Sequence, residues 1–275
     1  MKNIYITDLD HTFLRSDLSL SDYTKKIWNS YENEAILGIA TARTYKKTAQ
    51  FLEGISVSAP MILLDGALIA TMDKKIIDAK FISKDVADNI IDEGSRLGIY
   101  PFVLSLVDDA LNEAFSYSTT LNSYQSEIIK RYVDDDHTHA FTNLQAMENN
   151  FKLVYMAEEM LLQALEENLR LIYGDELKYI LAPEAYMGCY FLTILHKDAD
   201  KSHGIRSVSE AVGFDLEKLT VFGDNLNDIG MFELANTSIA VANAQEELKE
   251  KADIVLPYSN DEDAVAKYLE GLQNA

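Results

Sequence analysis

Cysteine is nearly absent from this sequence: Cys189 is the single cysteine among 275 residues, so the chain cannot form an internal disulfide. Little cysteine suits a reducing compartment. Asp8 interrupts any apolar segment near the start of the sequence, which argues against a secretory signal. The longest apolar runs, such as Ala35–Ala40 and Ala59–Leu64, fall far short of the roughly 20 residues of a membrane span. We therefore expect a cytoplasmic protein with no membrane partner.

Basic residues are also scarce, with 24 Lys and Arg against 45 Asp and Glu and a net charge of −21. This charge repels nucleic acid, and no basic patch with interleaved aromatic residues is present, so we expect no nucleic-acid partner. A small anionic substrate is still possible, because screening beyond about 8 Å lets local groups decide what a cleft binds. An acidic protein that handles phosphate needs a metal ion and a few well-placed cations. The sequence leaves the oligomeric state open.

Strand and helix patterns alternate over residues 1–82 and again from Lys201 onward. Continuous apolar runs such as AILGIA at 35–40 are typical of strands that are covered on both faces. The alternation predicts an α/β fold with a Rossmann-like, doubly wound parallel sheet. The expected strands of the α/β core are residues 3–7, 35–40, 61–64, 219–222, 238–241 and 253–256, with a hairpin-like stretch after 61–64 that continues to Lys80. The expected helices are 21–33, 44–53, 201–212, 226–235, 245–251 and 261–273.

The pattern differs between these two parts, where pairs of strands lie between helices. This predicts an inserted α+β domain with an antiparallel sheet. We expect the α/β core to comprise residues 1–82 and 196–275, and the inserted domain to comprise residues 83–195. An acidic run at Asp134–Asp136, followed by His137 and His139, could bind metal, but its weak pattern favours a solvated loop.

Polar residues follow the predicted core strands where each strand ends. Asp8 and Asp10 follow the first strand, Thr41 follows the second, Lys201 opens the helix after the insertion, and Asp224 follows the strand at 219–222. In open α/β sheets ligands bind beyond the carboxyl ends of the strands. We therefore expect these carboxylates, the hydroxyl and the lysine to converge on one edge of the sheet.

Carboxylates gathered in one crevice repel each other unless a cation neutralises them. Oxygen ligands without cysteine or a histidine pair favour magnesium over zinc. A magnesium ion, a lysine and a threonine hydroxyl suit a phosphoryl group, whose transfer depends on positioning and charge stabilisation. A carboxylate can also attack phosphorus and form an aspartyl-phosphate.

These residues carry a family resemblance. DLDHTFL at 8–14, the turn at Thr41, Lys201 and GDNLND at 223–228 resemble the four motifs of the haloacid-dehalogenase-like hydrolases. LLDGALIA at 63–70, DADKSHGI at 198–205 and the C-terminal VANAQEELKEKADIVLPYSNDEDAVAKYL resemble the Cof-type sugar-phosphatase group. The insertion lies between motifs two and three, where that group has a large substrate-selecting cap.

The resemblance implies a role for each matching residue. Asp8 would be the nucleophile and a metal ligand, and Asp10 the general acid/base with its backbone carbonyl on the metal. Asp224 would complete the Mg²⁺ ligands, and Asp228 would support the metal-bound water or Lys201. The residues expected to bind the phosphoryl group are Thr41, Ala42, Lys201 and Asn227.

Several positions depart from the family pattern or have an alternative reading. His11 and Ala42 replace glycines that are usual in the family, and His11 must accept or alter the backbone geometry of a permissive position. Asp65 stands where the family often has Asn, and we assign it no catalytic role. Arg43 is interpreted as a structural or surface residue. Lys197 is the alternative to Lys201 as the third-motif lysine.

The sequence thus predicts a magnesium-dependent phosphatase that hydrolyses small phosphorylated metabolites, sugar phosphates above all, through an aspartyl-phosphate. Two alternatives stay open: a phosphomutase on the same scaffold, and a non-catalytic phosphosugar-binding or regulatory protein. The particular metabolite cannot be read from the sequence, because the side chains of the insertion that would select it cannot be positioned.

Overall fold

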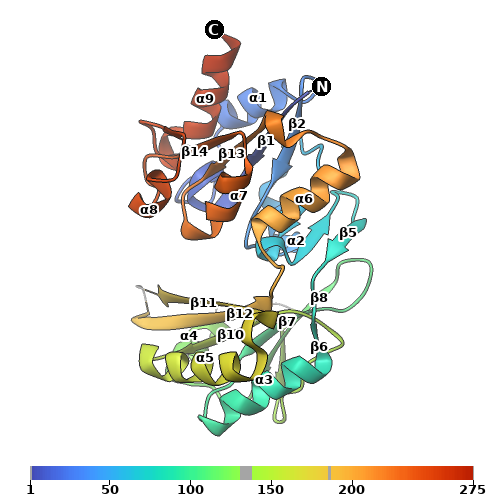
Figure 1. The fold of residues 1–275 in the computed structure, drawn as a ribbon, viewed down its shortest axis with the longest axis vertical. Helices are drawn as coiled ribbons and strands as arrows, with labels where there is room; N and C mark the ends of the chain where they lie inside the picture. Colours follow the sequence, from blue (N-terminus) through green and yellow to red (C-terminus); the bar gives the residue numbers. More distant parts are fainter. Residues whose placement is uncertain (1, 131–137, 185–186, 275) are drawn as a thin grey trace. The chain divides into compact units, whose positions relative to one another are not determined.

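The computed structural model describes residues 2–130, 138–184 and 187–274 (Figure 1). The chain divides into two compact units. Met1–Ala79 and Ala199–Ala275 form the first, called the core unit below, and Lys80–Asp198 form the second, called the inserted unit. Among the described helices, none combines the length and the hydropathy of a membrane span.

A parallel sheet organises the core unit, with its strands in the order β15–β14–β13–β1–β2. Its strands are β1 (Asn3–Thr7), β2 (Ala35–Ile39), β13 (Leu219–Gly223), β14 (Thr237–Ala240) and β15 (Ile254–Val255). Successive residues of β1 from Ile4 to Thr7 are all buried, because helices cover both faces of the sheet. The predicted α/β class is confirmed.

A smaller antiparallel sheet adjoins β2 in the core unit. It consists of β3 (Met61–Leu63), β4 (Leu68–Ala70) and β5 (Ile76–Ala79). A parallel bridge between Ala40 and Ile62 joins β3 to the end of β2. The hairpin turn at residues 64–66 therefore lies near the carboxyl edge of the parallel sheet.

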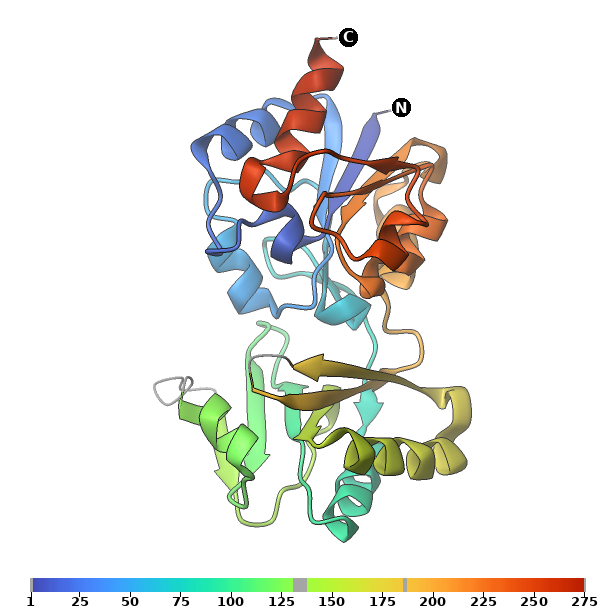
Figure 2. The ribbon, with the colours of Figure 1, turned by 90° about the vertical axis from the view of Figure 1, so that its left-hand side faces the viewer.

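Helices lie on both sides of the parallel sheet, with α1 on one side and α6 and α7 on the other (Figure 2). The helices of the core unit are α1 (Asp22–Ser30), α2 (Tyr45–Phe51), α6 (Lys201–Val212), α7 (Ile229–Leu234), α8 (Glu246–Lys249) and α9 (Ala264–Gln273). The Asp200 side chain caps α6 by accepting the His203 N–H at 2.8 Å, so Lys201 occupies the first turn. The helix expected from Asp261 starts only at Ala264, because Asp263 has a left-handed φ of 60°.

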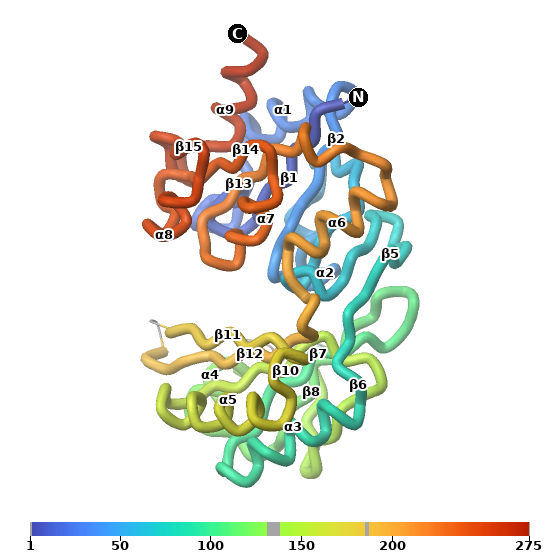
Figure 3. The backbone as a smooth tube through the Cα atoms, in the orientation of Figure 1, coloured from blue at the N-terminus to red at the C-terminus, as the bar shows by residue number. Residues whose placement is uncertain are grey.

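The inserted unit is an α+β unit, as predicted (Figure 3). Its elements are β6 (Ile82–Ser83), α3 (Lys84–Arg96), β7 (Phe102–Leu106), β8 (Glu113–Ser118), α4 (Ser123–Lys130), β9 (Thr138–Phe141), β10 (Asn149–Ala157), α5 (Glu159–Tyr173), β11 (Leu177–Glu184) and β12 (Cys189–His196). The strand order is β11–β12–β10–β7–β8–β9, and β6 pairs with β10.

Most strand pairs of this unit are antiparallel, but β8 and β9 run parallel. Buried residues of α3 and α5, such as Ile90 and Leu165, pack against Leu153 and Leu192 of the sheet. The prediction of a loop is wrong at His139, because this residue lies on β9. Asp134–Asp136 and His137 lie outside the described residues.

Candidate active site

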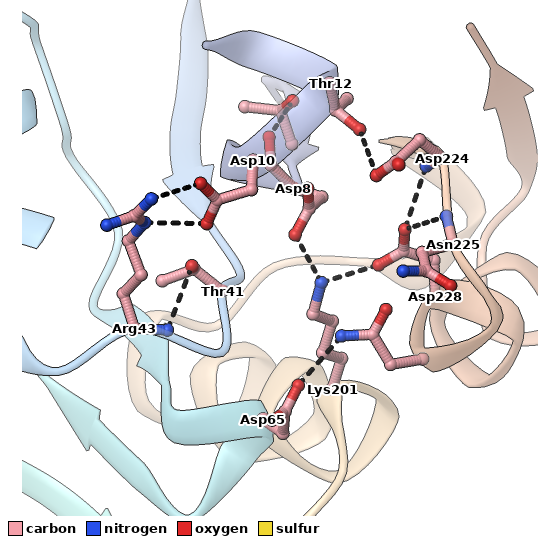
Figure 4. Close-up of polar contacts among 12 residues, drawn as sticks. Asp8, Asp10, Thr12, Thr41, Arg43, Asp65, Lys201, Asp224, Asn225 and Asp228 are labelled. Atoms are coloured by element: carbon pink, nitrogen blue, oxygen red, sulfur yellow. Dashed lines mark hydrogen bonds and ion pairs between the residues drawn. The ribbon is translucent and has the colours of Figure 1, made fainter. Parts of the chain in front are cut away.

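The site forms where β1 and β13 end side by side in the parallel sheet. Figure 4 shows its side chains and the polar contacts among them. The register pairs Thr7 with Phe222, so Asp8 and the Gly223–Asp224 turn emerge together at the carboxyl edge. Lys201 comes to the same edge from the first turn of α6. The sheet thus brings together residues that are about 200 positions apart, as parallel strand ends require.

Lys201 is the buried centre of the site. Its side chain is fully buried, and its Nζ lies 2.5 Å from Asp8 Oδ1 and 2.6 Å from Asp228 Oδ1. Burial alone would lower the pKa of Lys201, but the charges of Asp228, Asp8 and Asp65 outweigh that effect and raise it. These two contacts favour the cationic form of Lys201, which lies between Asp8 and Asp228. The alternative, Lys197, is half exposed and bonds to the adjacent Asp198 at 2.8 Å.

Asp228 shapes the turn that carries Asp224. Its Oδ2 accepts the backbone N–H groups of Asp224 at 2.9 Å and Asn225 at 3.1 Å, while its Oδ1 accepts from Lys201. Gly223 is required beside it, since a Cβ there would lie 2.5 Å from Asp228 Oδ2. Both carboxylate oxygens of Asp228 are thus engaged, which fits the supporting role expected for this residue.

Carboxylate oxygens of Asp8, Asp224 and Asp228 lie within 4.8 Å of one another. Burial and the charges of Asp228 and Asp224 raise the pKa of Asp8 well above its ordinary value, against the lowering effect of Lys201. Burial and the Asp228 charge also raise the pKa of Asp224 to about 6, although the Thr12 hydroxyl donates to it at 3.0 Å. The three carboxyl groups carry more negative charge than Lys201 alone can neutralise. Their oxygen atoms are the ligands that a hard divalent cation such as Mg²⁺ prefers.

Asp10 lies beside this cluster and pairs with Arg43. The Arg43 Nε donates to Asp10 Oδ2 at 2.7 Å, and its Nη2 donates to Asp10 Oδ1, so the contact is bidentate. The guanidinium also lies over the Phe51 ring, 4.5 Å from its centroid. The sequence interpretation of Arg43 missed this partner, although its position two residues after Thr41 placed it at the strand end.

Of the other predicted phosphate-binding residues, Thr41 and Ala42 lie in the loop after β2, and Asn227 lies in a single 3-10 turn, Leu226–Asp228, after β13. Thr41 is buried, and its hydroxyl accepts the Arg43 N–H at 3.2 Å, whereas Ala42 is exposed. Asn227 is exposed, and its Nδ2 donates to Asp65 Oδ1 at 2.9 Å. Asp65, for which no catalytic role was expected, therefore contacts a residue that is expected to bind phosphate.

His11 occupies the position of the usual glycine in a left-handed conformation, with φ 57° and ψ 8°. Its carbonyl accepts the Asn243 Nδ2 at 2.8 Å, which ties this turn to the loop after β14. The residue thus accepts the permissive backbone geometry rather than altering it.

Residues 5–269 match the family described as haloacid dehalogenase-like hydrolases. The chain belongs to this hydrolase family. The resemblance drawn from the motifs is therefore confirmed, and the match includes the two segments of the core unit and the insertion between them. In this haloacid dehalogenase-like hydrolase, Asp8, Lys201, Asp224 and Asp228 all lie within the matched residues.

Similar proteins span nearly the whole chain. The Bacillus subtilis protein YwtE is named 5-amino-6-(5-phospho-D-ribitylamino)uracil phosphatase. It is 26% identical over an alignment 294 residues long, which covers 99% of this hydrolase and 98% of YwtE. The structure of TM0651 from Thermotoga maritima is similar with a TM-score of 0.81 and 25% identity, covering 98% and 97% of the two chains. The HAD subclass IIB sugar phosphatase BT4131 shares the fold, with a TM-score of 0.75, 18% identity and full coverage of both chains, 100% each.

Proposed function

We propose that this hydrolase is a magnesium-dependent phosphatase that cleaves small phosphorylated metabolites, sugar phosphates in particular, through a phosphorylated Asp8. The observation that carries the proposal is the buried Lys201 ammonium, which lies between Asp8 and Asp228 beside Asp224. This arrangement supplies a carboxylate nucleophile and a cation that offsets the charge of a phosphoryl group next to it.

In the first step, Asp8 attacks phosphorus in line with the bond to the leaving oxygen, which breaks as the new bond forms. Asp10 gives its proton to the leaving alcohol, which would otherwise depart as an alkoxide; such general acid catalysis contributes about 10²–10⁴-fold. Lys201 stabilises the charge that builds up on the phosphoryl oxygens. Thr41 at the end of β2 orients those oxygens.

In the second step, the Asp10 carboxylate takes a proton from water, and the resulting nucleophile attacks the phosphorus of phospho-Asp8. The phosphorus–Asp8 bond breaks and releases inorganic phosphate and a free Asp8 carboxylate. The bidentate contact with Arg43 fixes the orientation of the Asp10 side chain. Before Asp10 can donate a proton in the first step, its carboxyl group has to break the hydrogen bonds with Arg43.

The proposed Mg²⁺ ligands are Asp8, Asp224 and the backbone carbonyl of Asp10. When bound, the ion would neutralise charge on the nucleophile and the phosphoryl group. Asp228 is not included, because its two oxygens are engaged by Lys201 and by backbone N–H groups.

The substrate class rests on similar proteins. YwtE acts, by its name, on a phosphorylated ribityl compound, and BT4131 is named a sugar phosphatase. Residues 83–195 are proposed to form the cap that selects among such substrates, and the cytoplasmic location stays a prediction.

A phosphate-release screen over sugar, nucleotide and cofactor phosphates with Mg²⁺ tests the activity. Free phosphate should accumulate, and Asp8→Asn should release none. Accumulation of an isomeric sugar phosphate without free phosphate would instead identify a mutase, and binding without turnover would identify a non-catalytic protein.

Nitrophenyl phosphate separates the roles of the two aspartates. Nitrophenolate leaves without a proton, so Asp10→Asn should still phosphorylate Asp8 and give a stoichiometric nitrophenol burst, but the phosphoenzyme should persist. Rapid-quench kinetics and the intact-protein mass measure both events. A burst from Asp8→Asn would show that another residue is the nucleophile.

A further inference from the structure

The turn between β3 and β4 has an unusual backbone. Leu64, Asp65 and Gly66 are consecutive left-handed residues, with φ values of 52°, 56° and 90°. Left-handed geometry is costly for residues other than glycine, and least so for Asn and Asp. Such geometry persists where the surroundings impose it, and it concentrates at functional sites.

Contacts on both sides impose this geometry. The Asp65 N–H donates to the Thr41 carbonyl at 3.0 Å, and the Leu64 N–H donates to the Arg43 carbonyl at 3.1 Å. On the other side, a Cβ on Gly66 would lie 2.0 Å from the Asp200 carbonyl oxygen. The turn is therefore held between the loop of Thr41 and the start of the helix that carries Lys201.

The Asp65 carboxylate faces groups that are proposed to bind phosphate (Figure 4). Asp65 is 8% exposed, and its Oδ1 accepts from Asn227 Nδ2 at 2.9 Å. The charge of Asp65 also raises the pKa of Lys201, although less than the charges of Asp228 and Asp8 do. Among the described side chains of the site, aspartates outnumber Lys201 and Arg43, so Asp65 adds negative charge where an anion has to bind.

We propose that Asp65 weakens the binding of the phosphoryl group, because its carboxylate competes for the Asn227 amide and for the charge of Lys201. The proposal rests on the proposed phosphatase function. Ester substrate and inorganic phosphate share this phosphoryl group, so contacts to it hold the product as firmly as the substrate. Weaker contacts with the phosphoryl group favour release of the phosphate product. Discrimination between substrates then depends on contacts with the rest of the metabolite.

Two variants separate the charge of Asp65 from its hydrogen bond. Asp65→Asn removes the charge but keeps an oxygen that can accept from Asn227, and Asn tolerates the left-handed backbone. Asp65→Gly removes both and fits a φ of 56° without strain. Both variants therefore suit the existing turn, and a loss of folding is not expected from either.

Calorimetric binding of inorganic phosphate, in buffer with Mg²⁺, is the test. Asp65→Asn should bind phosphate about tenfold more tightly than the wild type, the equivalent of about 1.4 kcal/mol. Asp65→Gly should bind it more tightly still, since it also frees Asn227. The inhibition constant of phosphate against nitrophenyl phosphate should fall in the same order.

Glu53→Gln is the matched control, because it removes one negative charge from an exposed position after α2 in the same unit; its phosphate affinity should equal that of the wild type. Phosphate affinity that does not rise in either Asp65 variant, or that rises equally in Glu53→Gln, overturns the proposal. Tighter binding by the Asp65 variants in a protein that releases phosphate from no ester would uphold the role of Asp65 and reject the phosphatase function.

Discussion

Replacing Lys201 by methionine would remove the ammonium that contacts both Asp8 and Asp228 while keeping a side chain of similar length. The lysine side chain is fully buried, and the side chains of Asp8 and Asp228 are 8% and 0% exposed. Removing one member of a buried ion pair leaves an uncompensated charge and costs about 3–5 kcal/mol of stability. We expect a loss of that size at pH 7, together with a fall of several orders of magnitude in turnover.

The loss should depend on pH with a definite sign. Burial raises the pKa of Asp8 even with Lys201 present, and removing the lysine should raise it further. A carboxyl whose pKa is raised by folding does not destabilise the protein below its unfolded pKa, where it is protonated in both states. It destabilises increasingly as the pH rises from there to its folded pKa. Lys201→Met should therefore lose the least stability near pH 4 and the most at neutral pH.

The single tryptophan makes the measurement specific to the core unit. Trp28 is buried, and its Nε1 donates to the Ser56 carbonyl at 2.8 Å, so its fluorescence reports the unfolding of this unit in urea. Lys251→Met is the stability control within the same unit, because Lys251 is exposed and its Nζ lies 3.4 Å from Glu233 Oε1; it should cost less than about 1 kcal/mol, as expected for a surface ion pair. Lys197→Met is the control for turnover, because Lys197 is half exposed. Equal stability losses in Lys201→Met and Lys251→Met at pH 7, or a greater loss of turnover in Lys197→Met, would refute the assignment of Lys201.

Three further predictions concern the metal, the hydrogen bonds of Asp263 and the left-handed backbone of His11. EDTA should abolish phosphate release and Mg²⁺ restore it, whereas Ca²⁺, which takes about 6–8 oxygen ligands in place of the octahedral set of Mg²⁺, should inhibit; full activity in chelated buffer would reject the metal site. Burial alone would raise the pKa of Asp263, but hydrogen bonds from Arg15, Ser21 and Thr24 outweigh it and lower that pKa, so its contribution is lost as the pH falls through the folded pKa. Asp263→Asn should therefore cost about 2–3 kcal/mol at neutral pH and much less in acid, and a pH-independent difference in urea midpoints would contradict this. His11→Gly should leave stability unchanged or raise it by up to about 1.5 kcal/mol, because relief of a left-handed cost of about 1–2 kcal/mol is offset by about 0.5–1 kcal/mol of extra chain entropy. A loss of stability in urea unfolding would reveal side-chain contacts of His11.

The α/β class and the inserted α+β unit could be predicted from the sequence, because the spacing of apolar residues within a short segment shows which of its faces are buried. A strand that is covered on both faces is a continuous apolar run, as at residues 35–40, and a capped amphipathic segment is a helix, as at Lys201–Val212, whose bounds match the prediction. The convergence of Asp8, Lys201 and Asp224 was equally predictable. Parallel strands that share a sheet also share their carboxyl edge, so residues that follow those strands meet wherever they lie in the chain.

The partners of individual side chains at that edge were decided only by the tertiary structure. Arg43 pairs with Asp10, 33 positions away, and Asn227 with Asp65, 162 positions away. The local sequence at each of these residues is compatible with a solvated loop. Their contacts depend on how the turn at Leu64–Gly66 is held against the loop of Thr41 and the start of α6, and that backbone geometry is imposed by hydrogen bonds and close packing between distant segments.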